Sequence, residues 1–198
     1  MKKLTKYILA TFIILFLNLN ATAQGQNFSN DEIREQSKIL YMGNKSEEAQ
    51  KHILTIPEED RTAFDYYLIG LTSTTSQDAI KAYDKSIQID NKFYQSYFNI
   101  ANEYFNLKDF DRAIYFYKQA TKYNKELDYG YYNLGCAYLN IDEYHNARKS
   151  FESAIKINPE EPDYYFNLGY TYKRLNNPKR ADKAIMLYNE LMKKRTSN

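Results

Sequence analysis

The side chains best suited to covalent or acid–base chemistry are one cysteine and two histidines in a chain of 198 residues. Cys136 lies within a run of helical spacing, and His145 follows nine residues later, in the turn before the next expected helix. A nucleophilic thiol needs a base within hydrogen-bond reach, and this spacing does not supply one. We therefore interpret Cys136 as a small, partly buried residue. A lone cysteine also excludes a disulfide within the chain.

Metal, cofactor and phosphate sites are not indicated either. His52, His145 and Cys136 are too scattered to form a metal-ligand cluster. The six glycines do not gather into a phosphate-binding loop. Acidic pairs at 47–48 and 160–161 fall at helix starts or turns, where solvated carboxylates are expected. The sequence therefore predicts a protein that has no cofactor and is not an enzyme.

The first 23 residues are typical of a bacterial signal peptide. Lys2, Lys3 and Lys6 form a basic start, residues 7–19 are almost wholly apolar, and residues 21–23 supply the small-x-small pattern that a signal peptidase cleaves. The apolar run is short for a membrane span. We expect an exported protein, periplasmic or secreted, that is cleaved after Ala23 and has no integral membrane span in its mature part. An uncleaved anchor is the alternative.

The charge balance argues against nucleic acid as a partner. The whole chain has a formal charge of +2, but three of its 27 basic residues and none of its 25 acidic residues lie in the leader. The mature chain therefore carries a formal charge of −1. A surface that binds nucleic acid needs a basic field in the folded part, and this balance does not provide one.

One segment recurs at a fixed interval of 34 residues. Residues 131–138 read Tyr-Tyr-Asn-Leu-Gly-Cys-Ala-Tyr, and similar segments occupy 97–104 and 165–172. A period of this size indicates stacked helical or mixed units. From Asn30 onward the apolar residues have helical spacing, with Gly, Asn or Pro at regular intervals, which predicts helix–turn–helix hairpins. Such a protein acts through an extended surface rather than a catalytic pocket.

The predicted hairpins differ in how clearly they repeat. The second helix of each clear hairpin carries a small residue, an aromatic residue four positions later and another small residue three beyond that, as in Ala147, Phe151 and Ala154. Small side chains let two helices approach closely, and the ring fills the space beside them. The expected organisation is a flexible lead-in at 24–29 and a helical stack at 30–198, with a degenerate hairpin at 30–62, a weak one at 63–93, and clear ones at 94–127, 128–161 and 162–195.

These residues resemble the tetratricopeptide repeat. Leu134, Gly135 and Tyr138 match its first helix, while Ala147 and Phe151 match its second. The resemblance implies an all-α fold, an α-solenoid of about five stacked antiparallel hairpins in a right-handed superhelical arc. It also implies a protein that binds protein or peptide partners without catalysis.

The register of the last hairpin is left open between two alignments. Without an insertion, Ala181 takes the small site of the second helix. A three-residue insertion around 177–178 instead places Ala184 at the small site and Tyr188 at the aromatic one. We prefer the insertion because it restores the aromatic residue.

The resemblance also places a partner-binding groove along the first helix of each hairpin. The chain has 21 tyrosines and 11 phenylalanines, and several fall at positions that face the groove in this family. The alternative is that these rings only pack between neighbouring helices. The expected groove residues are Phe64, Tyr67, Phe98, Asn102, Phe105, Tyr129, Tyr132, Phe166, Tyr170, Lys173 and Arg174.

The last helix carries an apolar stripe formed by Ile185, Tyr188, Leu191 and Met192. We expect this stripe to contact a second copy of the chain or another partner. The leading functional hypothesis is a protein-binding scaffold of the cell envelope that holds a peptide segment in its aromatic groove. The alternative is a structural envelope protein that self-associates as a homo-oligomer. The sequence does not indicate which partner is bound.

Overall fold

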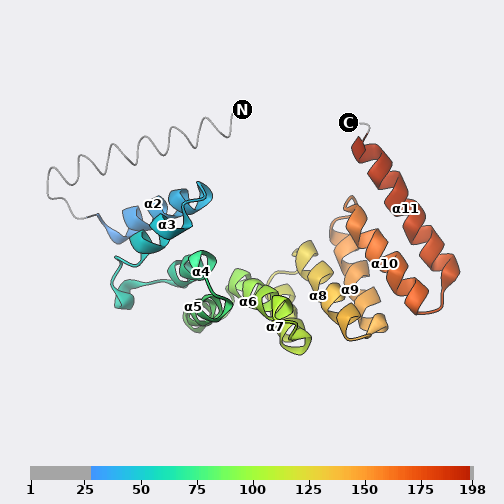
Figure 1. The fold of residues 1–198 in the computed structure, drawn as a ribbon, viewed down its shortest axis with the longest axis horizontal. Coiled ribbons are helices and arrows are strands. Elements are labelled where there is room, and N and C mark those ends of the chain that lie inside the picture. The colour runs from blue at the N-terminus through green and yellow to red at the C-terminus, as the bar shows by residue number, and fades with distance from the viewer. Residues whose placement is uncertain (1–27, 197–198) are drawn as a thin grey trace. The chain divides into compact units, whose positions relative to one another are not determined.

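The computed structural model describes residues 28–196, and in this range the chain forms ten α-helices and one 3-10 turn, with no strand (Figure 1). The leader and most of the lead-in lie outside the described residues, so their assignment stays a prediction. The elements are α2 (Asn30–Met42), α3 (Ser46–Ile53), η1 (Glu58–Asp60), α4 (Ala63–Thr72), α5 (Ser76–Ile89), α6 (Tyr94–Asn106), α7 (Phe110–Tyr123), α8 (Asp128–Asn140), α9 (Tyr144–Ile157), α10 (Pro162–Arg174) and α11 (Pro178–Thr196).

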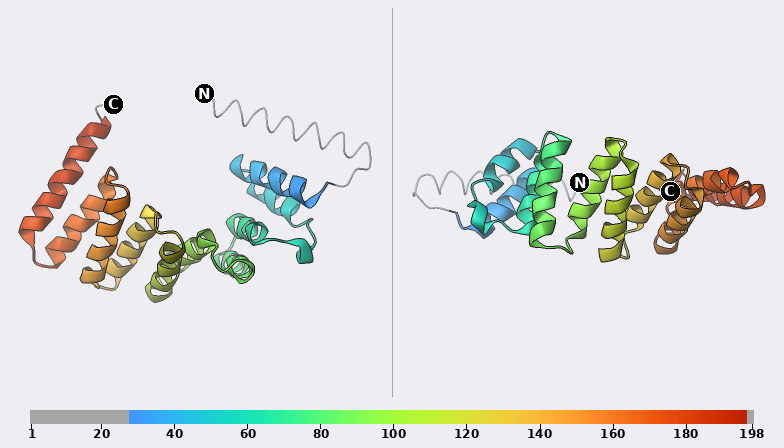
Figure 2. Two further views of the ribbon diagram at one scale, coloured as in Figure 1. Left: turned by 180° about the vertical axis from the view of Figure 1, so that it is seen from behind. Right: turned by 90° about the horizontal axis from the view of Figure 1, so that it is seen from below.

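The helices pair in chain order within two compact units, which divide the described residues between Asn91 and Lys92. In the first unit α2 packs on α3, α3 on α4, and α4 on α5. In the second unit the pairs are α6 with α7, α8 with α9, and α10 with α11, and α7 and α9 each also pack on the helix that follows. Figure 2 shows these hairpins from two further sides. The predicted all-α fold of consecutive helix hairpins is confirmed.

Side-chain caps explain where several helices begin. Ser29 and Thr62 each accept a hydrogen bond from the backbone N–H three residues later, and the carboxylates of Glu32 and Asp65 in turn accept one from the cap residue's own N–H. Thr75 caps α5 by the same kind of bond to a backbone N–H. These bonds satisfy N–H groups that have no partner inside the helix. The first turns are therefore fixed by local sequence, even in the degenerate first hairpin.

The core of the second unit is formed by the small and aromatic residues that the sequence pattern predicts to be buried. The small and aromatic residues of α7 and α9 are almost fully buried, and Ala113, Tyr117, Ala147 and Phe151 form one cluster with residues of α6, α8, α10 and α11. Because each hairpin has one apolar side, stacking is what removes these residues from water. The pattern residues of the two helices are Ala113, Tyr117 and Ala120, and Ala147, Phe151 and Ala154.

The turns within the hairpins of the second unit also repeat every 34 residues. Lys108, Asp142 and Asn176 all adopt the left-handed conformation, with φ of 60°, 60° and 58°. The helices on either side of each turn are separated by the same short interval, 107–109, 141–143 and 175–177. Equal turns leave no place for an insertion in the last hairpin.

Packing confirms that register. A Cβ atom added at Gly135 would lie 2.6 Å from the ring of Phe151, and one added at Gly169 would lie 2.8 Å from Ile185. Ile185 follows Phe151 by one 34-residue period, so Ala181 occupies the small site of α11. The preferred insertion was therefore wrong.

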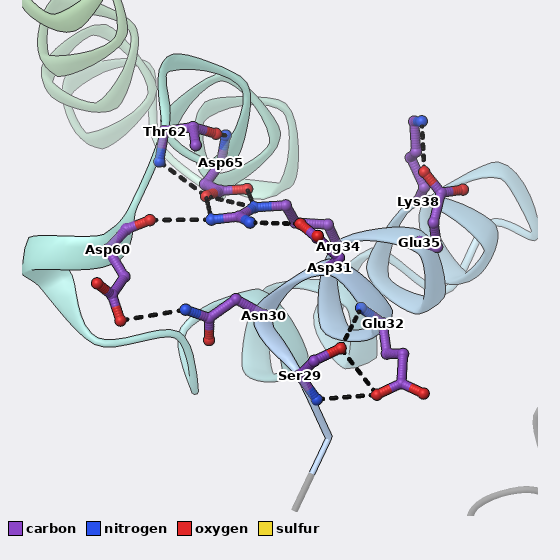
Figure 3. Close-up of polar contacts among 10 residues, drawn as sticks. All are labelled: Ser29, Asn30, Asp31, Glu32, Arg34, Glu35, Lys38, Asp60, Thr62 and Asp65. Carbon is purple, nitrogen blue, oxygen red and sulfur yellow. Dashed lines mark hydrogen bonds and ion pairs between the residues drawn. The ribbon is translucent and has the colours of Figure 1, made fainter.

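A partly buried ion pair holds α2 on α4 in the first unit (Figure 3). Asp65 is fully buried and accepts hydrogen bonds from the backbone N–H of Thr62 at 2.8 Å and from Nε of Arg34 at 3.0 Å. The same guanidinium donates to the backbone carbonyl of Asp60 at 2.9 Å and to the exposed carboxylate of Asp31 at 2.8 Å. Sequence reasoning did not find this pair, because its members lie 31 residues apart in hairpins that repeat weakly.

Asp65→Asn should lower the free energy of unfolding of the first unit by about 2–3 kcal/mol, because the guanidinium of Arg34 loses its buried carboxylate partner. Hydrogen exchange of the α2 amides, measured alongside urea unfolding, reports the loss. Asp31→Asn is the matched control, since it removes an exposed carboxylate from the same guanidinium and should change little. Equal effects of the two substitutions would contradict the assigned role.

Candidate functional site

The first helices of the second unit bury one side in the core and expose large rings on another. Leu134 of α8 and Leu168 of α10 are buried motif residues. On the same helices Tyr129, Phe166 and Tyr170 remain 46%, 50% and 44% exposed. Rings of this size are usually removed from water in a folded domain, so their exposure singles them out. We call Phe98, Tyr129, Tyr132, Phe166 and Tyr170 the aromatic face of α6, α8 and α10.

Ring contacts fix the part of this face that is contributed by α6 and α8. The ring of Phe98 meets that of Tyr129 edge to face, with centroids 4.9 Å apart, and lies 5.7 Å from the core ring of Tyr117. The ring of Tyr132 lies 5.0 Å from that of Tyr164 at the start of α10. Phe98 and Tyr132 are therefore half-buried between neighbouring helices, which is the alternative that the sequence left open for such rings.

Amide and hydroxyl groups link the same three helices. Asn133 of α8 donates to Oδ1 of Asn102 on α6 at 3.3 Å, and the hydroxyl of Tyr117 donates to the same oxygen at 2.7 Å. Asn167 of α10 donates to the hydroxyl oxygen of Tyr132 at 3.0 Å. Burial raises the pKa of both tyrosines well above the usual range, so they stay neutral near pH 7. These bonds hold the first helices in one arrangement.

The other predicted groove residues have different surroundings. Phe105 is half-buried against Phe110 of α7, with ring centroids 5.3 Å apart. Lys173 is exposed at the end of α10. Arg174 donates to the hydroxyl of Tyr170 at 3.1 Å, and its guanidinium lies 4.5 Å from the centre of a tyrosine ring on α9. The C-terminal end of the aromatic face therefore carries positive charge.

Phe64 and Tyr67 belong to α4 in the first unit, and both are half-buried. Their rings lie 6.1 Å apart, and Tyr67 also contacts Tyr83 of α5 at 6.0 Å. The ammonium group of Lys38 lies 5.2 Å from the centre of the Phe64 ring. These two rings pack within their own unit.

The apolar stripe of α11 is partly used inside its own hairpin. Ile185 lies against Gly169, and the ring of Tyr188 packs on that of Phe166 with centroids 5.3 Å apart. Leu191 is half-buried, and Met192 is exposed. Of the four residues predicted to contact a second copy, two therefore contact α10.

Cys136 has no activating partner in the surroundings that the structure gives it. The thiol is partly buried in α8, and this burial raises its pKa to about 11. His145 is exposed in the first turn of α9. Within residues 28–196 no group of three or more histidine, cysteine or acidic side chains is arranged to hold a metal ion. The thiol therefore behaves as a small packing residue.

Cys136 should react with iodoacetamide at pH 8 roughly 100-fold more slowly in the folded protein than in urea. The thiolate is the reactive form, and a free cysteine has a pKa of about 8.5. Because the folded pKa is raised, the rate should keep rising toward pH 11. Mass spectrometry of the alkylated chain gives both rates. Equal rates in the folded and the unfolded protein at pH 8 would show that the thiol is not protected.

Family models match three segments of the second unit. A tetratricopeptide repeat model matches residues 94–127 and 162–191, and a TPR repeat model matches residues 141–176. A search of the curated proteins found no match to this sequence. None of the helices between residues 28 and 196 is long and apolar enough to cross a membrane.

Solved structures of similar fold carry the name MamA. One, titled "Crystal structure of MamA", is 20% identical with a TM-score of 0.76, and the match covers 82% of this chain and 97% of that one. A MamA fragment beginning at residue 41, from Desulfovibrio magneticus RS-1, is 19% identical with a TM-score of 0.74, and the match covers 83% of this chain and 96% of that one. At this level of identity the similarity establishes the fold alone.

Proposed function

We propose that the chain, in which tetratricopeptide repeat models match three segments, is a protein-interaction scaffold and that its aromatic face binds a segment of a protein partner. The observation that carries the proposal is the exposure of Tyr129, Phe166 and Tyr170 on helices whose other side is fully packed. Burying such rings against a partner yields a large apolar contact together with a polar edge from the tyrosine hydroxyls.

The packing of the face favours binding without rearrangement. Phe98 and Tyr132 are held by neighbouring rings, and Asn102 and Asn167 by hydrogen bonds between helices. A surface that is already ordered loses little conformational entropy when a partner binds. The partner is therefore expected to be an apolar peptide segment, extended or helical, that lies across α6, α8 and α10. Lys173 favours an acidic residue at the end of the segment nearest to it.

We also propose that the protein works in the cell envelope, without catalysis. The signal-peptide pattern of residues 1–23 supports export. The raised pKa of Cys136 argues against an activated nucleophile. Self-association through α11 is less favoured as a function, because Ile185 and Tyr188 are engaged by α10.

Changing Tyr129, Phe166 and Tyr170 together to serine should reduce partner capture at least tenfold, because the exposed rings are the proposed contact. Affinity capture from the native cells, followed by quantitative mass spectrometry, measures the change. Phe98 and Tyr132 are left in place because their rings support the core.

The matched control removes three exposed apolar residues of the first unit, Met42, Leu54 and Ile89, in the same way. Both triple variants should keep the helical circular dichroism and the melting temperature of the parent protein within a few degrees. Undiminished capture by the aromatic-face variant, or equal loss in the control, would overturn the proposal.

A further inference from the structure

A second apolar site lies on a different side of α10 from the aromatic face. A pocket of about 300 Å³ opens between α9, α10 and α11. Its apolar lining comes from the side chains of Ile155, Leu168, Ala184 and Leu187 and from the rings of Tyr165 and Tyr172. Phe166 and Tyr170, which belong to the aromatic face, are not among its lining residues.

The position of Ala184 in the pocket holds a ring in the first hairpin of this unit. Ala184 of α11 corresponds to Ser150 of α9 one period earlier and to Phe116 of α7 two periods earlier. The ring of Phe116 lies 6.4 Å from Tyr97 and 5.6 Å from Tyr104, the two tyrosines of α6 that correspond to those in the pocket. In the hairpin at 94–127 the protein thus fills this space itself, whereas in the last hairpin it leaves the space open.

The charges around the pocket are positive on balance. Arg180 and Lys183 line it, and within residues 28–196 neither side chain forms an ion pair. The guanidinium of Arg180 lies 5.7 Å from the centre of the Tyr172 ring. The one carboxylate in the lining, Glu152, is already engaged, by Arg148 at 2.8 Å and by the hydroxyl of Tyr172 at 2.8 Å. Two cations therefore remain uncompensated beside an apolar cavity.

We propose that this pocket is a second docking site, which takes a large apolar side chain of a protein partner together with a neighbouring aspartate or glutamate. A volume of about 300 Å³ is at the lower end for ligand pockets, so it suits one side chain of leucine or phenylalanine size better than a large ligand. The two cations select an acidic neighbour by charge complementarity. The site does not depend on the aromatic face, so the two sites bind different segments.

A displayed library of random 12-residue peptides, selected on the purified protein, tests the assignment. The expected peptides combine leucine, isoleucine or phenylalanine with nearby aspartate or glutamate. Ala184→Phe should weaken their binding at least tenfold, because the new ring occupies the pocket as Phe116 does in the earlier hairpin. Leu187→Ser is a second pocket variant, and serine is the residue that α9 carries at the corresponding position 153.

Charge reversal distinguishes an effect of the two cations that line the pocket from an effect of the net charge of α11. The double variant Arg180→Glu and Lys183→Glu should weaken binding of these peptides at least tenfold. The double variant Lys179→Glu and Lys194→Glu makes the same change in net charge outside the pocket lining, and should leave binding within about twofold. Replacing Phe166 of the aromatic face by serine should also leave these peptides bound.

Three outcomes would overturn the proposal. Peptide binding that is weakened by neither Ala184→Phe nor Leu187→Ser would show that the pocket is not used. Binding that is lost only when Phe166 is replaced would assign the peptides to the aromatic face and would support the proposed function alone. Binding of dodecanoate that Ala184→Phe abolishes, with no acidic peptide selected, would make the pocket a site for small anionic amphiphiles.

Discussion

The structure depends on the close approach of the two helices of a hairpin, where Gly70, Gly135 and Gly169 on the first helix leave room for a large side chain on the second. The ring of Phe151 occupies the space that a Cβ atom at Gly135 would need, and Ile185 does the same at Gly169. This contact fixes the rotation of each first helix about its own axis. Once it is made, the buried motif residues face the core, and the residues at the intervening positions must face water or the next hairpin.

That rotation explains why one helix, α10, carries two unlike surfaces. Phe166 and Tyr170 remain exposed on one side, while Tyr165 and Tyr172 line the pocket between α9 and α11 on another. Neither surface holds an activated nucleophile or a cluster of metal ligands in the part of the chain that the structure describes. Both surfaces are built from apolar groups with charge at their margins, which suits the binding of protein segments rather than catalysis.

Much of the fold followed from the 34-residue period, because each repeat buries the same small and aromatic residues. The last register did not follow, since an insertion near Pro178 was needed to place Tyr188 at the aromatic site of the repeat. Pro178 is instead the first residue of α11, where its missing N–H leaves no hydrogen bond unmade. The pair of Arg34 and Asp65 was missed because it joins hairpins in which the repeat pattern is weak. The sequence also could not separate half-buried Tyr132 from exposed Phe166, since both hold the same repeat position and differ only in what packs beside them.

The most direct test of the account is photo-crosslinking in living cells, with benzoylphenylalanine in place of Phe166 and, in separate strains, of Tyr129 or of Ile89. The substituted side chains at 129 and 166 lie on the aromatic face, whereas Ile89 is an exposed apolar residue of the first unit. The account predicts that one and the same protein partner is joined to the chain from both positions on the aromatic face and not from position 89. Adducts that are equally abundant from Ile89, or none from either aromatic position in cells where the chain still captures its partner, would contradict it.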